Sequence, residues 1–347
     1  MEQNQMGQNI KPIEIVNSDY DEYLHVSYSF TNTCNYDCNY CWPVSKEGTH
    51  RFPDYDMLIK NMDHMLGIYR NHFNKKTIRM NLLGGEPTLW PRLGEFVEWC
   101  HTNYNCRVTM SSNGSRTLRW WKEYCHYFDD IQISVHHEYA DLNHIKNVLD
   151  EIYSRGDIMT AAQVLIDPLH WDKCINILED LSNHPVPWLV KSRVVMDLED
   201  KNIRSEYNED QLEFLTDKVK RIPPKEYVQR MRDLGKIQNS ERANAIIKFN
   251  DGTEKQYNTF EVWKNQWHKF YGWECNLGVD RVTIHPSGAI AGSCSATNIF
   301  NSDTTYNILD PEFATKFTPE IIKPMVCREI FCSGCSSDIR LTKKKNV

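Results

Sequence analysis

The sequence lacks three features that would place the protein in a membrane or on an acidic polymer. No apolar run approaches the roughly 18–20 residues that a transmembrane helix needs. The polar start over residues 1–5 does not resemble a secretory signal peptide. Basic residues are not in excess, because the formal net charge is −7, which argues against broad electrostatic binding to nucleic acids or anionic membranes. We therefore expect a cytoplasmic protein that has neither a membrane nor a nucleic acid as its partner.

Disulfides are not expected either, although the chain has 12 cysteines. Without an export signal, many cysteines indicate reduced thiols and metal sites. Four of them are scattered through the chain, and as isolated free cysteines they are expected to be small buried hydrophobic side chains. These four are Cys100, Cys106, Cys125 and Cys174. The others fall into two groups, around residues 34–41 and 275–335.

The first group is a C-x3-C-x2-C run formed by Cys34, Cys38 and Cys41. A short loop can turn three thiolates toward one inorganic cluster, and cysteine thiolates are the usual ligands of Fe–S clusters. A [4Fe–4S] cluster normally has four such ligands, so three would leave one iron open to another molecule. Zinc is the alternative, although structural zinc sites usually combine two ligand pairs, and no Cys or His follows closely enough to complete one.

Apolar patterning predicts six strands that alternate with helices. The predicted strands cover residues 23–30, 78–83, 107–111, 131–136, 160–167 and 188–196. Such alternation is typical of parallel βαβ units, which place their ligand sites at the carboxyl ends of the strands.

Polar motifs lie at or beyond the ends of several predicted strands. After the second comes Gly84-Gly85-Glu86-Pro87, whose glycines let the backbone lie flat against a ligand and whose carboxylate can accept hydrogen bonds from an ammonium group. Ser112 and Asn113 follow the third strand and are candidate site residues. The alternative is that they only form an Asn-Gly turn without a role in the site. In the fourth, Ser134 and His136 share one face, and this face can be polar if it lines a cofactor and substrate site.

Together these residues resemble the radical S-adenosylmethionine (SAM) superfamily. The cysteine loop, with aromatic Tyr40 before its third cysteine, is similar to that family's signature loop. The resemblance implies an α/β fold, a partial (β/α)6 TIM barrel, and a [4Fe–4S] cluster whose open iron binds SAM. It also implies reductive cleavage of SAM to a 5′-deoxyadenosyl radical, which removes a hydrogen atom from the substrate. An external electron donor of the flavodoxin or ferredoxin type is the implied partner.

The resemblance also assigns roles to the motifs. Residues 84–87 would border the methionine amino group of SAM, and Ser134 would lie near its ribose. His136 stands where relatives often carry an acid, and is offered as a substrate-facing donor or base, with a structural histidine as the alternative. Arg193, in the sixth strand, is expected to reach a carboxylate of SAM or substrate, or else to form a salt bridge.

The second cysteine group predicts another metal site. Cys275 and Cys294 flank a predicted hairpin, and Cys332 and Cys335 form a closely spaced pair. Four thiolates suit zinc as well as [4Fe–4S]. Their order resembles the twitch domain, a short relative of the SPASM domain, which implies an auxiliary [4Fe–4S] cluster on these four cysteines. Cys327 would be an alternative ligand, a hydrogen-atom donor or a buried thiol.

The chain is therefore predicted to have three parts: a barrel core over residues 1–200, a linker or insertion over 201–271, and a small α+β twitch domain over 272–347. Residues 1–21 are expected to be a loosely held lead-in, and the aromatic group around Trp267 a helix packed on the barrel.

With two clusters and SAM, the predicted activity is that of an oxidoreductase. Net oxidation or cross-linking of a peptide or small molecule is expected. The alternatives are an Fe–S electron carrier without catalytic activity and a zinc-stabilised binding module.

Overall fold

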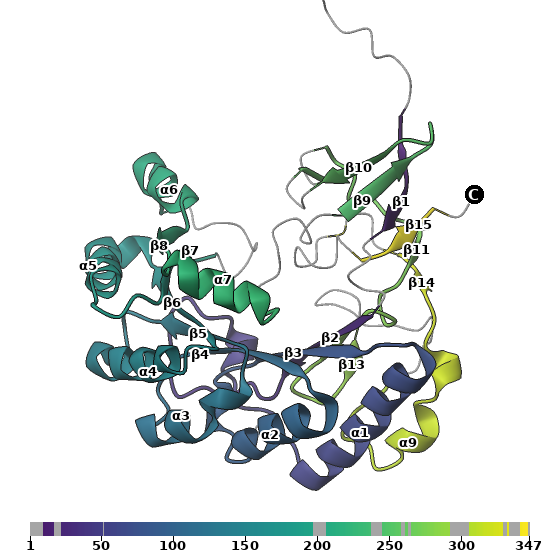
Figure 1. The fold of residues 1–347 in the computed structure, drawn as a ribbon, viewed down its shortest axis with the longest axis horizontal. Helices are drawn as coiled ribbons and strands as arrows, with labels where there is room; N and C mark the ends of the chain where they lie inside the picture. The colour runs from purple at the N-terminus through teal and green to yellow at the C-terminus, as the bar shows by residue number, and fades with distance from the viewer. Residues whose placement is uncertain are drawn as a thin grey trace, which may run out of the picture.

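The computed structural model contains a larger sheet of nine strands and a smaller sheet of six (Figure 1). It describes residues 10–16, 22–50, 52–196, 206–236, 245–257, 261–262, 265–291, 305–328, 332 and 341–345. The strands of the larger sheet are β2 (Tyr23–Ser29), β3 (Thr77–Leu83), β4 (Arg107–Ser112), β5 (Asp130–Val135), β6 (Met159–Ile166), β7 (Leu189–Val194), β8 (Val219–Arg221), β12 (Arg281–Ile284) and β13 (Ile290–Ala291).

The larger sheet has the order β13-β12-β2-β3-β4-β5-β6-β7-β8. Neighbouring strands are parallel from β12 through β7, and only β13 and β8 at the two ends run antiparallel. The six predicted core strands are β2 to β7, so the α/β class and the βαβ alternation are confirmed. The sheet is open rather than closed, as a partial barrel requires.

The helices between residues 55 and 182 cover one side of this sheet (Figure 1). The helices are α1 (Tyr55–His72), α2 (Leu93–Tyr104), α3 (Leu118–Tyr124), α4 (Leu142–Ser154), α5 (Trp171–Ser182), α6 (Glu209–Thr216), α7 (Lys225–Asp233) and α9 (Phe313–Lys316). Side-chain alternation along β5 explains the packing, because Ile131, Ile133 and Val135 are fully buried in the main hydrophobic core. Asp54 caps α1 by accepting a hydrogen bond from the Met57 backbone N–H at 2.9 Å.

The opposite face of the sheet is polar. Ser134 of β5 pairs with Gln163 of β6, which pairs with Lys191 of β7, and Leu165 pairs with Arg193 one step further along. These residues alternate with the buried apolar ones, so the same alternation that builds the core leaves a hydrophilic inner face. That face agrees with the polar inner lining predicted from the fourth strand.

The smaller sheet corrects two of the sequence predictions. Its strands are β1 (Pro12–Val16), β9 (Ala245–Phe249), β10 (Glu254–Tyr257), β11 (Glu274–Cys275), β14 (Met325–Val326) and β15 (Lys343–Lys344). Residues 12–16 are therefore not a loose lead-in, because β1 pairs with both β9 and β15. The prediction of a helix for the aromatic group around Trp267 is wrong for the described residues. Residues 265–270 have no regular secondary structure. Trp267 and Phe270 instead pack with Ile15 and Ile247 of this sheet.

The predicted C-terminal part divides between the two sheets. β12 and β13 extend the larger sheet beside β2, whereas β11, β14 and β15 belong to the smaller one. The predicted linker likewise supplies β8 to the larger sheet and β9 and β10 to the smaller.

A buried ion pair ties β12 to the core. Lys75 Nζ lies 2.6 Å from Asp280 Oδ1, and both side chains are almost fully buried. Removing one partner of such a pair leaves an uncompensated buried charge, which typically costs about 3–5 kcal/mol. Lys75→Ala is therefore expected to lower the free energy of unfolding by about that amount, measured by urea denaturation.

The neighbouring residue offers the control. Lys76 pairs with Glu22, but both side chains are more than half exposed, and such surface pairs contribute about 0–1 kcal/mol. Lys76→Ala should therefore change stability little. Equal effects of the two substitutions would show that the buried pair does not hold β12 in place.

Candidate functional site

The cysteine loop begins directly after β2, and the structure brings its three cysteines together. Each of Cys34, Cys38 and Cys41 lies near enough to the other two for their charges to interact. Burial raises the pKa of the Cys34 and Cys41 thiols, and it raises the pKa of Cys38 to about 12. Three adjacent thiols that resist ionisation alone are the donor set that a metal cation would convert to thiolates.

The Cys38 sulfur has two hydrogen-bonding neighbours. His136 Nδ1 lies 3.4 Å from this sulfur and 3.2 Å from the Tyr40 hydroxyl, and a hydrogen bond from Tyr40 lowers the pKa of Cys38 in part. The Tyr40 and His136 rings are stacked, with centroids 5.9 Å apart. Burial lowers the pKa of His136 to about 4, so this imidazole is neutral at pH 7.

The sequence predicts that His136 faces the substrate, and the structure shows that it contacts Cys38 and Tyr40 of the cysteine loop. Because its pKa lies well below neutral, it is a weak base at pH 7. Its Nδ1 atom can instead donate to the Cys38 sulfur, in the tautomer that carries a proton there.

The two glycines of the Gly-Gly-Glu-Pro motif face the backbone that leads into Cys34. The Gly85 N–H donates to the Thr31 carbonyl at 2.8 Å and the Glu86 N–H to the Thr33 carbonyl at 2.9 Å. A Cβ atom on Gly84 would lie 2.6 Å from the Thr31 carbonyl oxygen, and one on Gly85 would lie 2.2 Å from that of Thr33. The contact of these glycines with SAM stays a prediction, and the structure shows that they also pack against the protein's own backbone.

Glu86 is fully buried and joins the ends of β3 and β4. Its Oε1 accepts hydrogen bonds from the Thr88 N–H (3.0 Å), the Thr88 hydroxyl (2.6 Å) and the Ser112 hydroxyl (2.8 Å). Its Oε2 accepts one bond, from the Asn113 N–H at 2.6 Å. Burial raises the pKa of Glu86, while these bonds oppose the rise. With a single described donor, Oε2 keeps capacity for a further one.

Asn113 connects the end of β4 to the cysteine loop. Its side-chain amide donates to Asn35 Oδ1 at 2.9 Å and lies 3.9 Å from the Cys34 sulfur. Ser112 and Asn113 thus share Glu86 as an acceptor and lie beside the cluster loop, as the carboxyl ends of adjacent parallel strands should.

The remaining predicted site residues are Pro87, Ser134 and Arg193. Pro87 is buried and begins a short 3-10 helix, Pro87–Leu89, which Glu86 caps. Ser134 is half-buried on the inner face of β5. Arg193 is exposed on the inner face of β7, and it forms no hydrogen bond or ion pair with the residues that the structure describes.

One residue of the loop was missed by the sequence reasoning. Lys46 Nζ donates to Asp37 Oδ1 at 2.5 Å and to the Cys38 carbonyl at 2.8 Å. Its charge also lowers the pKa of Cys41. Lys46 thereby fixes the cysteine loop from the following turn, a contact that no spacing in the sequence signals.

Residues 28–167, which carry all of these contacts, match the model of the Radical SAM superfamily. The similarity to this family model is confined to that part of the chain.

Proteins of known activity and a solved structure are similar to parts of the chain. The S-adenosylmethionine-dependent nucleotide dehydratase RSAD2 of Oncorhynchus mykiss is 27% identical over 189 residues, covering 50% of this chain and 52% of that protein. The GTP 3′,8-cyclase of Haemophilus ducreyi is 29% identical over 118 residues, covering 33% of each. The chain thus spans about half of the first relative and a third of the second. A solved structure, native anSMEcpe with bound AdoMet, shares 14% identity at a TM-score of 0.48, covering 86% of this chain and 83% of that one.

The radical SAM match does not extend to the second cysteine group. Cys275 is buried in the main core, whereas Cys327 and Cys332 pack against the hydrophobic cluster of the smaller sheet. Cys294 and Cys335 lie outside the described residues. The auxiliary cluster therefore stays a prediction, and Cys327 has the same surroundings as the predicted ligand Cys332.

The four cysteines outside the two groups lie in the interior of the protein. Cys100, Cys106, Cys125 and Cys174 are all buried, as expected of small hydrophobic side chains.

Among the described residues, none of the helices combines the length and the apolar character that crossing a bilayer requires.

Proposed function

We propose that this protein is a radical SAM enzyme that cleaves SAM at a [4Fe–4S] cluster held by Cys34, Cys38 and Cys41. The observation that carries the proposal is the convergence of these three thiols beside the buried carboxylate of Glu86, at the carboxyl ends of β2, β3 and β4. When bound, the reduced cluster supplies the electron for reductive cleavage of SAM to a 5′-deoxyadenosyl radical, which then takes a hydrogen atom from the substrate.

The chain's own residues prepare this site for a sulfonium cofactor with an amino acid end. The three thiolates would hold the cluster, and the hydroxyl of Tyr40 and Nδ1 of His136 would stabilise the thiolate of Cys38. The carboxylate of Glu86 is oriented by donors from Thr88 and Asn113, which leaves Oε2 able to accept from an ammonium group. Ser134 is proposed to lie near the ribose, and the polar inner face of the sheet to receive the substrate.

The finer parts of the proposal rest on the sequence pattern. An auxiliary [4Fe–4S] cluster on Cys275, Cys294, Cys332 and Cys335 would accept the electron left on the substrate radical, which favours a net oxidation. An external flavodoxin-type or ferredoxin-type protein would supply the first electron. We place this activity in the cytoplasm.

A nucleotide is the substrate class that we favour among small molecules. Two of the relatives act on nucleotides by name, a nucleotide dehydratase and a GTP cyclase. The inner face of β7 carries two cationic side chains, Lys191 and Arg193, on the polar side of the sheet, and cations of this kind pair with phosphates. The peptide substrate remains the second candidate.

The test begins with protein purified without oxygen. The proposal expects brown protein with about eight iron atoms per chain, four for each cluster, and formation of 5′-deoxyadenosine when dithionite and SAM are added. Iron without that product would indicate an electron carrier, and colourless zinc-containing protein a binding module. Ribonucleoside triphosphates are then added singly, and consumption of one of them would support the nucleotide class over a peptide.

A change at His136 tests how the cluster is tuned. His136→Phe keeps an aromatic ring beside Tyr40 but removes the donor to the Cys38 sulfur. Hydrogen bonds to cluster sulfurs favour the reduced state. The variant is therefore expected to bind iron normally while its cluster potential, measured by redox titration monitored by electron paramagnetic resonance, becomes more negative. An unchanged potential would show that Nδ1 does not donate to this sulfur.

A further inference from the structure

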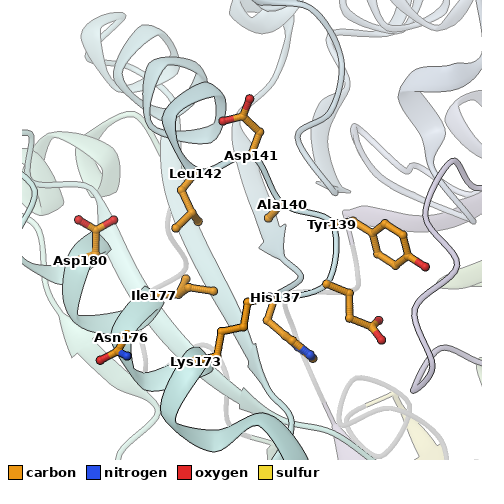
Figure 2. Close-up of a pocket in the computed structure, with 10 residues that line it drawn as sticks. His137, Tyr139, Ala140, Asp141, Leu142, Lys173, Asn176, Ile177 and Asp180 are labelled. Atoms are coloured by element: carbon orange, nitrogen blue, oxygen red, sulfur yellow. The ribbon is translucent and has the colours of Figure 1, made fainter.

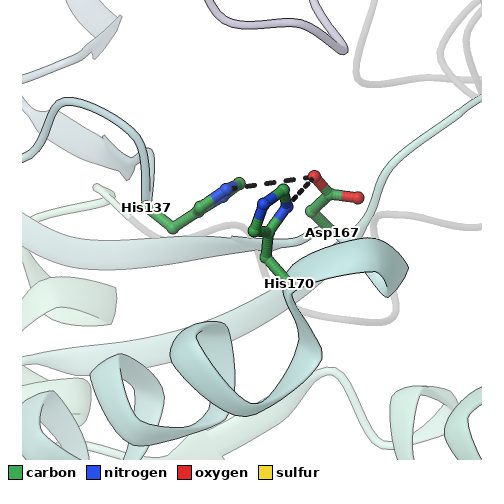
Figure 3. A group of neighbouring side chains, drawn as sticks. All are labelled: His137, Asp167 and His170. Atoms are coloured by element: carbon green, nitrogen blue, oxygen red, sulfur yellow. Dashed lines mark hydrogen bonds and ion pairs between the residues drawn. The ribbon is translucent and has the colours of Figure 1, made fainter.

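Three side chains beside the cysteine loop form a cluster that the proposed SAM chemistry does not use. They are His137, just after β5, and Asp167 and His170, just after β6 (Figure 3). One donor atom from each lies within 4.8 Å of the other two. Because β5 and β6 are parallel neighbours, their carboxyl ends bring these residues together at the same edge of the sheet.

Asp167 and His170 have ordinary local explanations. The Asp167 carboxylate is fully buried and caps the 3-10 helix Pro168–His170 through the Leu169 N–H at 3.2 Å. Its other oxygen, Oδ2, accepts from His170 Nδ1 at 3.0 Å. These contacts fix the carboxylate but leave the third member unexplained.

His137 is that unexplained member. Only 2% of its side chain is exposed, yet neither ring nitrogen has a hydrogen-bond partner among the residues that the structure describes. Its Nε2 points at Asp167 Oδ2 from 3.9 Å (Figure 3). That distance is too long for a hydrogen bond. It is close to the spacing of two ligands of one ion, because bonds of about 2.0–2.2 Å at tetrahedral angles place two donor atoms about 3.4 Å apart, and a small movement of the side chains would reach that spacing.

The cluster is also accessible from outside. Almost half of the His170 side chain is exposed. His137 additionally lines an open pocket of about 850 Å³ between the segment leading into α4 and helix α5, where Lys173 lies beside it (Figure 2). A small ion thus has a route to the buried donors, which a metal site requires.

We propose that His137, Asp167 and His170 bind a divalent transition-metal ion of the Zn²⁺ or Fe²⁺ class. Two imidazoles and one carboxylate are a donor set that these ions prefer, and three protein ligands leave a position open for water or another small molecule. The ion would replace the proton that His170 now shares with Asp167, and would satisfy the buried nitrogen of His137. The hydrogen bond from the Leu169 N–H would hold the carboxylate in its ligating orientation.

Zinc binding to the anaerobic, iron-loaded protein tests this proposal. Equilibrium dialysis against Zn²⁺ alone, followed by elemental analysis, is expected to find one more zinc in the wild type than in His170→Ala or His137→Gln. Loss of an outer-shell partner already weakens metal affinity by about 10–100-fold, so removing a direct ligand should weaken it by at least about tenfold. The readout does not require SAM cleavage, so it stands or falls separately from the proposed enzyme.

A second histidine–aspartate pair supplies the matched control. His184 Nε2 lies 3.1 Å from Asp150 Oδ1 and 3.2 Å from Oδ2. Among the described residues, this pair is not part of a group of three side chains that could hold a metal ion. His184→Ala should leave the zinc content unchanged. Zinc bound equally by the wild type and both cluster variants, or not bound by any of them, would overturn the proposal. Iron content checks that each variant is folded, and His170→Ala alters a half-exposed side chain.

Discussion

Replacing Cys38 with alanine is expected to reduce 5′-deoxyadenosine to the level of an enzyme-free reaction. Cys38 is the middle ligand of the proposed cluster, and its sulfur accepts a hydrogen bond from Tyr40 and lies 3.4 Å from His136 Nδ1. With two thiolates left, the loop cannot hold a cluster that normally needs at least three protein ligands and an exchangeable fourth. The measurement is product formation with SAM and dithionite, together with iron content.

Cys174 provides the comparison for this loss. It is also buried, on α5 in the main hydrophobic core, and although it lies near Tyr40 it is not one of the predicted cluster ligands. Cys174→Ala should cost about 1 kcal/mol of stability, as an average core truncation does, and should leave SAM cleavage intact. Undiminished product from Cys38→Ala would remove the cysteine loop as the site of cleavage.

The second large effect is expected at Gly85, which packs against the backbone that leads into the cysteine loop. Gly85→Ala would place a Cβ atom 2.2 Å from the Thr33 carbonyl oxygen and 2.8 Å from that of Ser45. Both obstacles are backbone atoms, so no side-chain rotation relieves the contact, and the chain entering Cys34 must move. We expect the protein to lose the iron of the first cluster, about four atoms per chain, and with it all SAM cleavage.

Gly67 shows what a harmless substitution should do. It lies inside α1, where the nearest atom to an added Cβ is the Tyr104 hydroxyl oxygen at 3.9 Å. Gly67→Ala is expected to stabilise the protein by roughly 0.5–1 kcal/mol, because alanine loses less backbone entropy in a helix. If Gly85→Ala kept full iron and activity, the close packing of residues 84–86 on the cysteine loop would be unimportant for the site.

The sequence predicted the core sheet because its signals are local. Apolar alternation located β2 to β7, and the geometry of parallel strands then required the motifs at their ends to meet. The partners of Glu86 follow from that same geometry, since Ser112 and Asn113 end the adjacent strand.

Other features were not predictable because they depend on distant pairings. β1 is stabilised by strands about 230 and 330 residues further along the chain. The contact between His136 and Cys38 depends on how the cysteine loop returns to β5. The trio of His137, Asp167 and His170 combines two loops whose residues carry no shared motif.

The position of β12 has a consequence for how the protein is made. β2, which leads directly into the cysteine loop, has β3 on one side and β12 on the other. Until residue 284 has left the ribosome, β2 is therefore a bare edge strand with unpaired backbone groups. The segment that presents the first three sulfurs becomes an interior part of the sheet only late in synthesis, so nascent chains need protection from edge-to-edge association until then.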